Sequence, residues 1–239
     1  MQPYTSTFLK DQAQRTEPTR QFFYQHVNWS EAPICIDIGC GTGAITPEFT
    51  NEAPGVTAIG LDIDPISLSK AVRMQSQHSA LHFLLADATF LPFRPLIASF
   101  CLSHFTMMWI IDRIQALKEI RYVLCPKGIF ASIEPDYAER IEILKGRTEP
   151  LPTATYPIIK ALQTLGADPY TGSHLPSELE KLGFRNIRSG VLSWQFDADA
   201  MKAEIVDEAA LLEELGFQWT VPKFIYTPIW WIIATSERG

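Results

Sequence analysis

The stretch Pro33–Gly43, which reads P-I-C-I-D-I-G-C-G-T-G, decides the fold of this chain. Its first part, Ile34–Ile38, is short, apolar and rich in β-branched residues, which predicts a buried strand. Three glycines follow at alternate positions: Gly39, Gly41 and Gly43. Glycine tolerates positive φ and lets a ligand approach bare backbone, so we predict a cofactor-binding turn. The next segment, Ala44–Phe49, is compatible with a helix whose N-terminal end points at the ligand.

The turn alone leaves two kinds of cofactor open. The spacing Gly39-x-Gly41-x-x-Ala44 also fits the dinucleotide fingerprint G-x-G-x-x-G/A. Two features favour a different ligand: the additional Gly43, and Asp37 at the end of the strand. A carboxylate beside a pyrophosphate would be repelled, whereas one beside a cationic amino-acid group would be attracted.

The sequence I-D-I-G-C-G-T-G resembles the first motif of the class I methyltransferases that use S-adenosylmethionine (SAM), in particular small-molecule methyltransferases with a type 11 or UbiE-like domain. In that family the turn holds the methionine part of SAM, which carries an ammonium and a sulfonium. The resemblance implies SAM as the cofactor and S-adenosylhomocysteine as the product. It assigns to the cofactor the side chains and backbone of Asp37, Gly39, Cys40, Gly41 and Gly43.

A second strand is predicted at Val56–Leu61, and it ends in the sequence D-I-D-P. Asp62 lies where a strand-end carboxylate would accept hydrogen bonds from both ribose hydroxyls of SAM, although it would serve NAD equally well. Ile63 is assigned to the cofactor with it. Asp64 and Pro65 instead have the pattern of a helix N-cap and a first helical residue, so Asp64 is assigned to the cap.

A third strand, Leu81–Ala86, leads into Asp87 and Ala88. With the following T-F-L-P-F, this pair resembles the family motif that binds adenine. There the acidic side chain accepts a hydrogen bond from the adenine amino group, and the next backbone amide contacts a ring nitrogen. The alternative for Asp87 is an ordinary turn aspartate.

The fourth strand, Ile97–Ser103, departs from the family pattern because Ser99 stands where an aspartate is usual. At its other end Ser103 is assigned to the cofactor. His104 follows just outside the strand's carboxyl end, where open α/β sheets bind ligands. A lone histidine is more often structural, but this position favours substrate contact or proton acceptance. Trp109 is assigned to the wall of the substrate pocket.

The sequence E-I-R-Y-V-L-C-P-K-G resembles the family's next helix and turn, with Lys127 in place of a glycine. We expect Lys127 to keep negative φ while Gly128 takes the unusual conformation. The fifth strand then ends in Glu134, Pro135, Asp136 and Tyr137. Two carboxylates and a phenol could bind a substrate amine or hydroxyl and accept its proton, and the alternative is a solvated strand end.

The rest of the chain supplies helices and two further strands. Residues 1–32 are predicted to form a helical lid over the cofactor. Its helix is expected at Ser6–Val27, with a break at Pro18. Tyr4 and Phe8 are assigned to the substrate. The alternative is that this segment only packs against the core. Residues 33–239 form the cofactor domain, with an insertion at about 138–172. The remaining predicted helices are Ala138–Leu144, Thr153–Leu165, Leu175–Gly183 and Met201–Leu215, and the remaining strands are Phe184–Phe196 and Ile225–Thr235.

Composition narrows the class of protein. The formal net charge of −7 argues against nucleic acid or an anionic membrane as the main partner. The four cysteines lack C-x-x-C spacing and the histidines lack ligand spacing, so free thiols and no metal are expected. With no signal-peptide pattern and no run of membrane-spanning length, we expect a cytoplasmic protein.

These patterns predict a Rossmann-like α/β fold with a seven-stranded, mostly parallel sheet and helices on both faces. They predict a SAM-dependent methyltransferase that acts on a small, partly apolar acceptor. His104 and Glu134 are the candidate proton acceptors. An NAD-type oxidoreductase and a non-catalytic SAM-binding protein are the alternatives. The sequence specifies neither the acceptor nor the oligomeric state.

Overall fold

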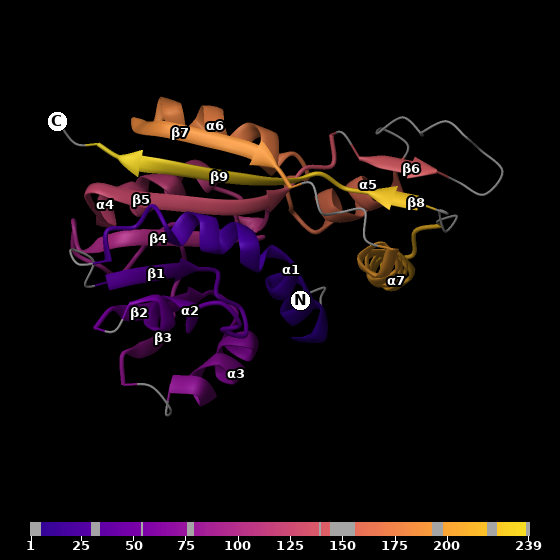
Figure 1. Cartoon of the computed structure of the whole chain (residues 1–239). Helices are drawn as coiled ribbons and strands as arrows, with labels where there is room; N and C mark the ends of the chain where they lie inside the picture. The colour runs from indigo at the N-terminus through magenta and orange to yellow at the C-terminus, as the bar shows by residue number, and fades with distance from the viewer. Residues whose placement is uncertain are drawn as a thin grey trace.

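A seven-stranded sheet in the order β3-β2-β1-β4-β5-β9-β7 forms the centre of the molecule (Figure 1). The computed structural model describes residues 6–29, 34–53, 55–75, 79–138, 140–143, 156–192, 198–218 and 224–237. The strands of this sheet are β1 Ile34–Ile38, β2 Thr57–Asp62, β3 Leu81–Leu85, β4 Ala98–His104, β5 Leu124–Pro135, β7 Phe184–Val191 and β9 Ile229–Ser236. Strands β1 to β5 are parallel, and β9 runs antiparallel to both β5 and β7. The predicted fold class is confirmed.

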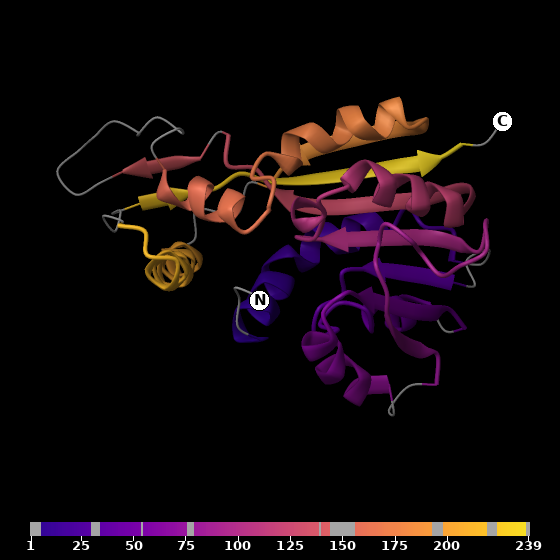
Figure 2. The same cartoon turned by 180° about the vertical axis from the view of Figure 1, so that it is seen from behind.

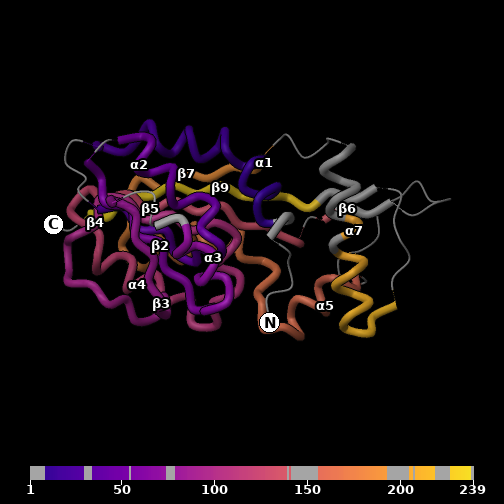
Figure 3. Tube along the Cα trace, turned by 90° about the horizontal axis from the view of Figure 1, so that it is seen from below, coloured from indigo at the N-terminus to yellow at the C-terminus, as the bar shows by residue number. Residues whose placement is uncertain are grey.

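Helices cover both faces of the sheet, because alternate residues of each buried strand point to opposite sides. The helices are α1 Ser6–Tyr24, α2 Glu48–Glu52, α3 Pro65–Gln75, α4 Arg113–Val123, α5 Pro157–Thr164, α6 Thr171–Lys181 and α7 Ala198–Glu214. Phe100 packs in a core with residues of α1 and α2, whereas the adjacent Cys101 packs with residues of α4 and α6. Figure 3 shows α1 and α2 along one face and α4 along the other.

A second, two-stranded sheet lies beyond the carboxyl edge of the main sheet and combines part of the predicted insertion with segments near the C-terminus. Strand β6, Ile141–Ile143, pairs with β8, Phe224–Tyr226, and α5 and α7 lie beside them (Figures 1 and 2). The predicted helix Ala138–Leu144 is therefore wrong. The predicted strand Ile225–Thr235 is two strands in different sheets, because Thr227 and Pro228 interrupt it.

Helix α1 runs unbroken through Pro18, so the predicted break is wrong. A proline inside a helix costs about 3 kcal/mol or more. Contacts on both sides of Pro18 offset this cost: Thr16 reaches His104, and Arg20 forms an ion pair with Glu48. Among the residues with a described placement, no helix is long and apolar enough to cross a bilayer.

Two predicted turns also differ from the structure. Helix α2 begins at Glu48 and is only five residues long, so the glycine turn does not open onto a helix and the predicted helix-dipole contribution is wrong. In the turn before the main part of β5, Lys127 takes φ +64°, contrary to the prediction. At position 128 a glycine is required because there is no room for a side chain: a Cβ would lie 2.8 Å from the carbonyl oxygen of Cys125.

Candidate active site

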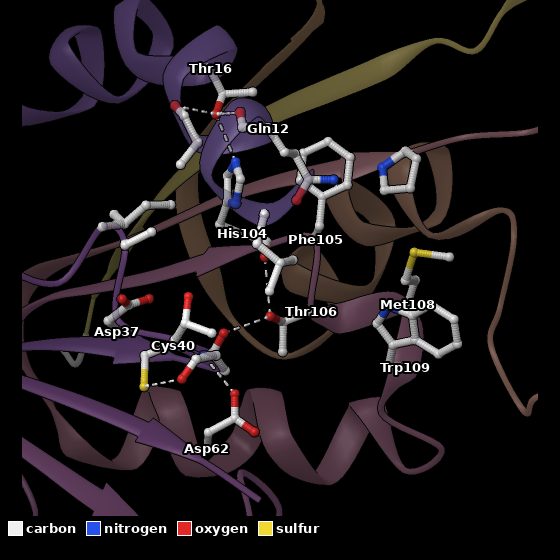
Figure 4. A pocket seen from close by; sticks show the side chains of 18 of the residues that line it. Gln12, Thr16, Asp37, Cys40, Asp62, His104, Phe105, Thr106, Met108 and Trp109 are labelled. Atoms are coloured by element: carbon white, nitrogen blue, oxygen red, sulfur yellow. Dashed lines mark hydrogen bonds between the residues drawn. The ribbon is translucent and has the colours of Figure 1, made fainter. Parts of the chain in front are cut away.

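A cavity of about 440 Å³ lies at the carboxyl edge of the sheet (Figure 4). One part is lined by the glycine turn and by the ends of β2 and β3, and the other by the segment after β4 and the chain around Tyr137. Helix α1 lines it through Leu9, Gln12, Ala13, Arg15 and Thr16. The same space is therefore bounded by the predicted cofactor turn and by a long helix that covers it.

The glycine turn presents bare backbone to this cavity. Gly39, Gly41 and Gly43 have φ values of +72°, +54° and +78°, as predicted for glycines of a tight turn. A Cβ at Gly39 would lie 2.2 Å from Thr106, so only glycine fits there. The nearest atom to a Cβ at Gly41 would be Leu9 of α1, 3.8 Å away. Gly39, Cys40 and Gly41 line the cavity, and Gly43 shapes the turn by donating to the Cys40 carbonyl at 2.8 Å.

Asp37 is a buried acid at the end of β1 and lines the cavity. The Thr46 hydroxyl donates to its Oδ2 at 2.6 Å. Burial raises the pKa of Asp37 from 3.8 to about 7, although the bond from Thr46 opposes the shift. In the described part of the chain no Lys, Arg or His forms an ion pair with Asp37. A cationic group of a ligand would therefore find a carboxyl with no direct cationic partner.

Asp64 forms the predicted helix cap, whereas the role of Asp62 as a ribose ligand stays a prediction. Asp62 accepts the backbone N–H groups of Gly41 at 2.7 Å and Asp64 at 2.8 Å, which ties the end of β2 to the glycine turn. Burial raises the pKa of Asp62. Asp64 caps α3 by accepting the N–H of Ser67 at 3.0 Å. The turn, with its two buried carboxyls, fits a ligand that carries a cationic amino-acid group and a ribose.

An apolar slot continues from Asp62 along the ends of β2 and β3. Ile63 is 68% exposed and lines it together with Ala86 and Ala88. Asp87 does not line the cavity: its exposed carboxylate accepts the N–H and hydroxyl of Thr89 at 2.8 and 2.7 Å, as a turn aspartate does. Its role as an adenine ligand stays a prediction.

His104, at the end of β4, is placed in the cavity as predicted. Its Nε2 lies 2.7 Å from the Thr16 hydroxyl of α1 (Figure 4). Burial and the nearby Arg20 cation hold the pKa of His104 well below its usual 6.5, so the ring is neutral. The apolar wall beside it includes Met108, Trp109 and Tyr137.

Comparison with known proteins decides the family. Residues 36–132 match the family model described as a methyltransferase domain, and this segment contains the glycine turn, Asp62 and His104. Residues 36–132 therefore form a methyltransferase domain, and the sheet has the strand order and directions of the class I SAM-dependent methyltransferase fold. This match favours SAM over the NAD-type alternative.

Several known proteins are similar to this segment of the chain. Mouse arginine-hydroxylase NDUFAF5 is 33% identical over 98 residues, which cover 41% of this chain and 27% of that protein. Trans-aconitate 2-methyltransferase of Methylobacterium radiotolerans is 33% identical over 108 residues, which cover 44% of this chain and 40% of that protein. The matched segments therefore span less than half of the length of these two relatives.

Solved structures share the whole fold. A putative methyltransferase of Haloferax volcanii, solved in complex with the activator Trm112, matches with a TM-score of 0.66 at 15% identity over 98% of this chain and 95% of that chain. Phosphoethanolamine N-methyltransferase 2 of Haemonchus contortus, solved with SAM, gives a TM-score of 0.62 at 14% identity over 87% and 49% of the two chains. At these identities the likeness concerns the fold alone.

Two acids predicted for catalysis or substrate binding do not reach the cavity. Glu134 is fully buried and accepts the Ser103 and Ser132 hydroxyls and backbone N–H groups of residues 106–108, at 2.9–3.4 Å. Asp136 accepts the N–H groups of Ala138 and Ser173, both at 2.7 Å. The predicted roles of both acids are wrong because their oxygens hold the chain around the site in place.

Ser103, predicted to bind the cofactor, also lies outside the cavity. Its hydroxyl donates to Glu134 at 3.1 Å on the opposite face of the sheet from α1. The site prediction is therefore wrong for Ser103. Tyr4 and the side chain of Phe8 lie outside the described part of the structure, so their assignment to the substrate stays a prediction.

Helix α1 and the C-terminal segment bring further polar groups to the cavity that the sequence patterns did not predict. Gln12, Arg15 and Thr16 come from α1, and Glu208 and Thr227 come from α7 and the link before β9. Buried Arg140 holds the last two, with contacts of 2.6–2.8 Å. The helical spacing of Gln12 and Thr16 was the available signal for α1, whereas nothing local marks Glu208.

Proposed function

We propose that this protein transfers the methyl group of SAM to a small, partly apolar acceptor. One observation carries the proposal: a single cavity joins the glycine turn and its buried acids to an apolar compartment that contains His104. A protein that only binds SAM needs the first part of this cavity. The second part, continuous with it, is where an acceptor would lie beside the cofactor.

The residues of the first part fit SAM by their chemistry. Asp37 would hold the cationic amino-acid group, and the bare backbone of Gly39 to Gly41 lets that group approach closely. Asp62 would accept the ribose hydroxyls, and Ile63 and Ala88 would enclose the adenine. When bound, SAM supplies a methyl group on a positively charged sulfur, which is an activated leaving group.

The residues of the second part orient the acceptor and exclude water. Met108, Trp109 and Tyr137 give it an apolar wall, and neutral His104 can accept a hydrogen bond or a proton. Helix α1 contributes Leu9 beside Gly41 and Thr16 beside His104 to the lining, which supports the predicted lid formed by residues 1–32. Alignment and exclusion of water are orientation effects, worth several kcal/mol or more in rate.

The nature of the acceptor is open to direct screening. Relatives named trans-aconitate 2-methyltransferase and malonyl-[acyl-carrier protein] O-methyltransferase suggest starting with small carboxylic acids. The apolar wall suggests adding phenols, aliphatic alcohols and amines. The net charge of −7 favours such small molecules, in the cytoplasm, over nucleic acid.

Two measurements test the proposal. Calorimetry should show binding of S-adenosylhomocysteine, and Gly41→Val should abolish it because a branched side chain at positive φ is strained and fills the turn. An assay of S-adenosylhomocysteine release should then identify an acceptor in the panel. Mass spectrometry distinguishes a methylated product from a hydroxylated one, which the relatives named arginine-hydroxylase make relevant. Binding without release across the whole panel would favour a non-catalytic SAM-binding protein.

A further inference from the structure

A continuous chain of polar side chains joins the segment after the glycine turn to His104. The Glu48 carboxylate accepts two hydrogen bonds from the Arg20 guanidinium, from Nε at 2.8 Å and Nη2 at 2.6 Å. The Arg20 Nη1 donates to the Thr16 hydroxyl at 2.7 Å, and this hydroxyl lies 2.7 Å from His104 Nε2. Arg20 and Thr16 are almost fully buried. Helix α1 is thereby connected to both α2 and the cavity.

The hydrogen positions at the Thr16 hydroxyl follow from its neighbours. Arg20 can only donate, and the carbonyl oxygens of Gln12, at 2.8 Å, and Ala13, at 3.2 Å, can only accept. A hydroxyl has one hydrogen and two lone pairs. If the hydrogen points to the carbonyls, the lone pairs accept from Arg20 and from a protonated His104 Nε2, and every short contact is satisfied.

The opposite arrangement, in which the Thr16 hydroxyl donates to His104, leaves the Thr16–Gln12 contact without a hydrogen. If Thr16 donated to His104 Nε2, its oxygen would face the Gln12 carbonyl oxygen at 2.8 Å with no hydrogen between them. Two oxygens at that distance repel each other. The arrangement with Nε2 protonated is therefore the favoured one, and it leaves Nδ1 of the neutral ring as an acceptor.

We infer that Thr16 is a positioning residue that holds His104 in the tautomer with a bare Nδ1, which accepts a hydrogen bond from a hydroxyl or amine of the acceptor. His104 lines the cavity, and Nδ1 has no hydrogen-bond partner among the side chains and backbone that the structure describes. An O–H or N–H acceptor can make this bond, whereas a thiolate or carboxylate has no hydrogen to give. The choice of substrate class rests on the proposed function, but the tautomer does not.

Long-range ¹H–¹⁵N NMR of the ¹⁵N-labelled full chain tests the tautomer directly. The chain has five histidines, so His104→Gln assigns the His104 resonances by their loss. The expected wild-type spectrum has a protonated Nε2 and a bare Nδ1. Thr16→Val should give tautomer-averaged nitrogen shifts, Thr16→Ser should restore the wild-type shifts, and Thr19→Val, a buried position on the same helix, should leave them unchanged. A wild-type Nδ1 that carries the proton, or an unaltered tautomer in Thr16→Val, would overturn the inference.

Turnover gives the second readout. With a hydroxyl or amine acceptor from the panel, Thr16→Val should lower kcat about fivefold, the size of one lost hydrogen bond, while the affinity for S-adenosylhomocysteine stays the same. Turnover only with the carboxylic acids of the panel would overturn the substrate class. No turnover with any acceptor, together with the expected NMR spectrum, would count against the proposed methyl transfer and leave the role of Thr16 intact.

Discussion

We predict that Asp37 couples the binding of S-adenosylhomocysteine to pH. Its buried carboxyl has a pKa of about 7 without ligand, raised by burial and by the negative charges of Glu48 and Asp62, while Thr46 and the Arg20 cation lower it. An ammonium group held beside Asp37 favours the ionised form, so binding lowers this pKa and releases a proton. Below pH 7 the free protein must give up that proton to bind. The affinity should therefore rise with pH up to about 7 and then level off.

The size of the effect follows from the pKa of about 7. The free carboxyl is roughly 90% protonated at pH 6 and roughly 10% at pH 8. If the bound state is ionised, about 0.9 protons leave on binding at pH 6 and about 0.1 at pH 8. The dissociation constant of S-adenosylhomocysteine should then be about tenfold larger at pH 6 than at pH 8, which corresponds to about 1.4 kcal/mol.

Calorimetry at pH 6, in two buffers with different ionisation enthalpies, measures the released proton. Asp37→Asn should abolish both the buffer dependence and the pH dependence between pH 6 and 8. Asp64→Asn is a matched control, because its carboxylate also lines the cavity but its pKa is lowered by its bonds to the start of α3. Equal heats in both buffers for the wild type, or a proton still released by Asp37→Asn, would refute the reasoning.

Three further substitutions test the structural assignments. Asp62→Ala should weaken binding of S-adenosylhomocysteine by about 1–3 kcal/mol in calorimetry, and an unchanged affinity would contradict its assignment to the cofactor. Arg20→Met should lower the free energy of unfolding in urea by about 3–5 kcal/mol, since it leaves the Glu48 carboxylate without its cationic partner. Arg94→Met, at an exposed position, should change the free energy of unfolding by less than about 0.5 kcal/mol. Glu134→Gln should lower the free energy of unfolding by about 2–3 kcal/mol, because the amide NH₂ of glutamine would face backbone and hydroxyl groups that donate hydrogen bonds. Equal thermal stability of this variant and the wild type would refute the structural role of Glu134.

The parts of the site that could be predicted from the sequence are set by local structure. The glycine turn requires backbone with positive φ, which few residue types other than glycine adopt. The position of the turn could therefore be predicted from its glycines. The helix cap at Asp64 could also be predicted, because a cap is defined by its distance from the first helical residue, Pro65.

The parts that could not be predicted depend on contacts between distant segments. Glu134 and Asp136 stand at a strand end like Asp62, but whether such a side chain meets the cavity depends on which face of the sheet it points to. That direction follows from the register of β5 between β4 and β9, which no local pattern encodes. The unbroken helix through Pro18 likewise depends on partners, Glu48 and His104, that lie 28 residues or more away along the chain.

The position of β9 has a consequence for how the protein is made. Strand β9 follows β7 in the chain, yet it lies between β5 and β7 and bonds to both. During synthesis on the ribosome, β1 to β5 and the glycine turn emerge first and can associate early. Strand β7 pairs only with β9 in this sheet, so it can join the sheet only after β9 has been synthesised and has paired with β5. Ile229, at the start of β9, also lines the cavity. The glycine turn can therefore form in the nascent chain before the wall of the cavity is complete.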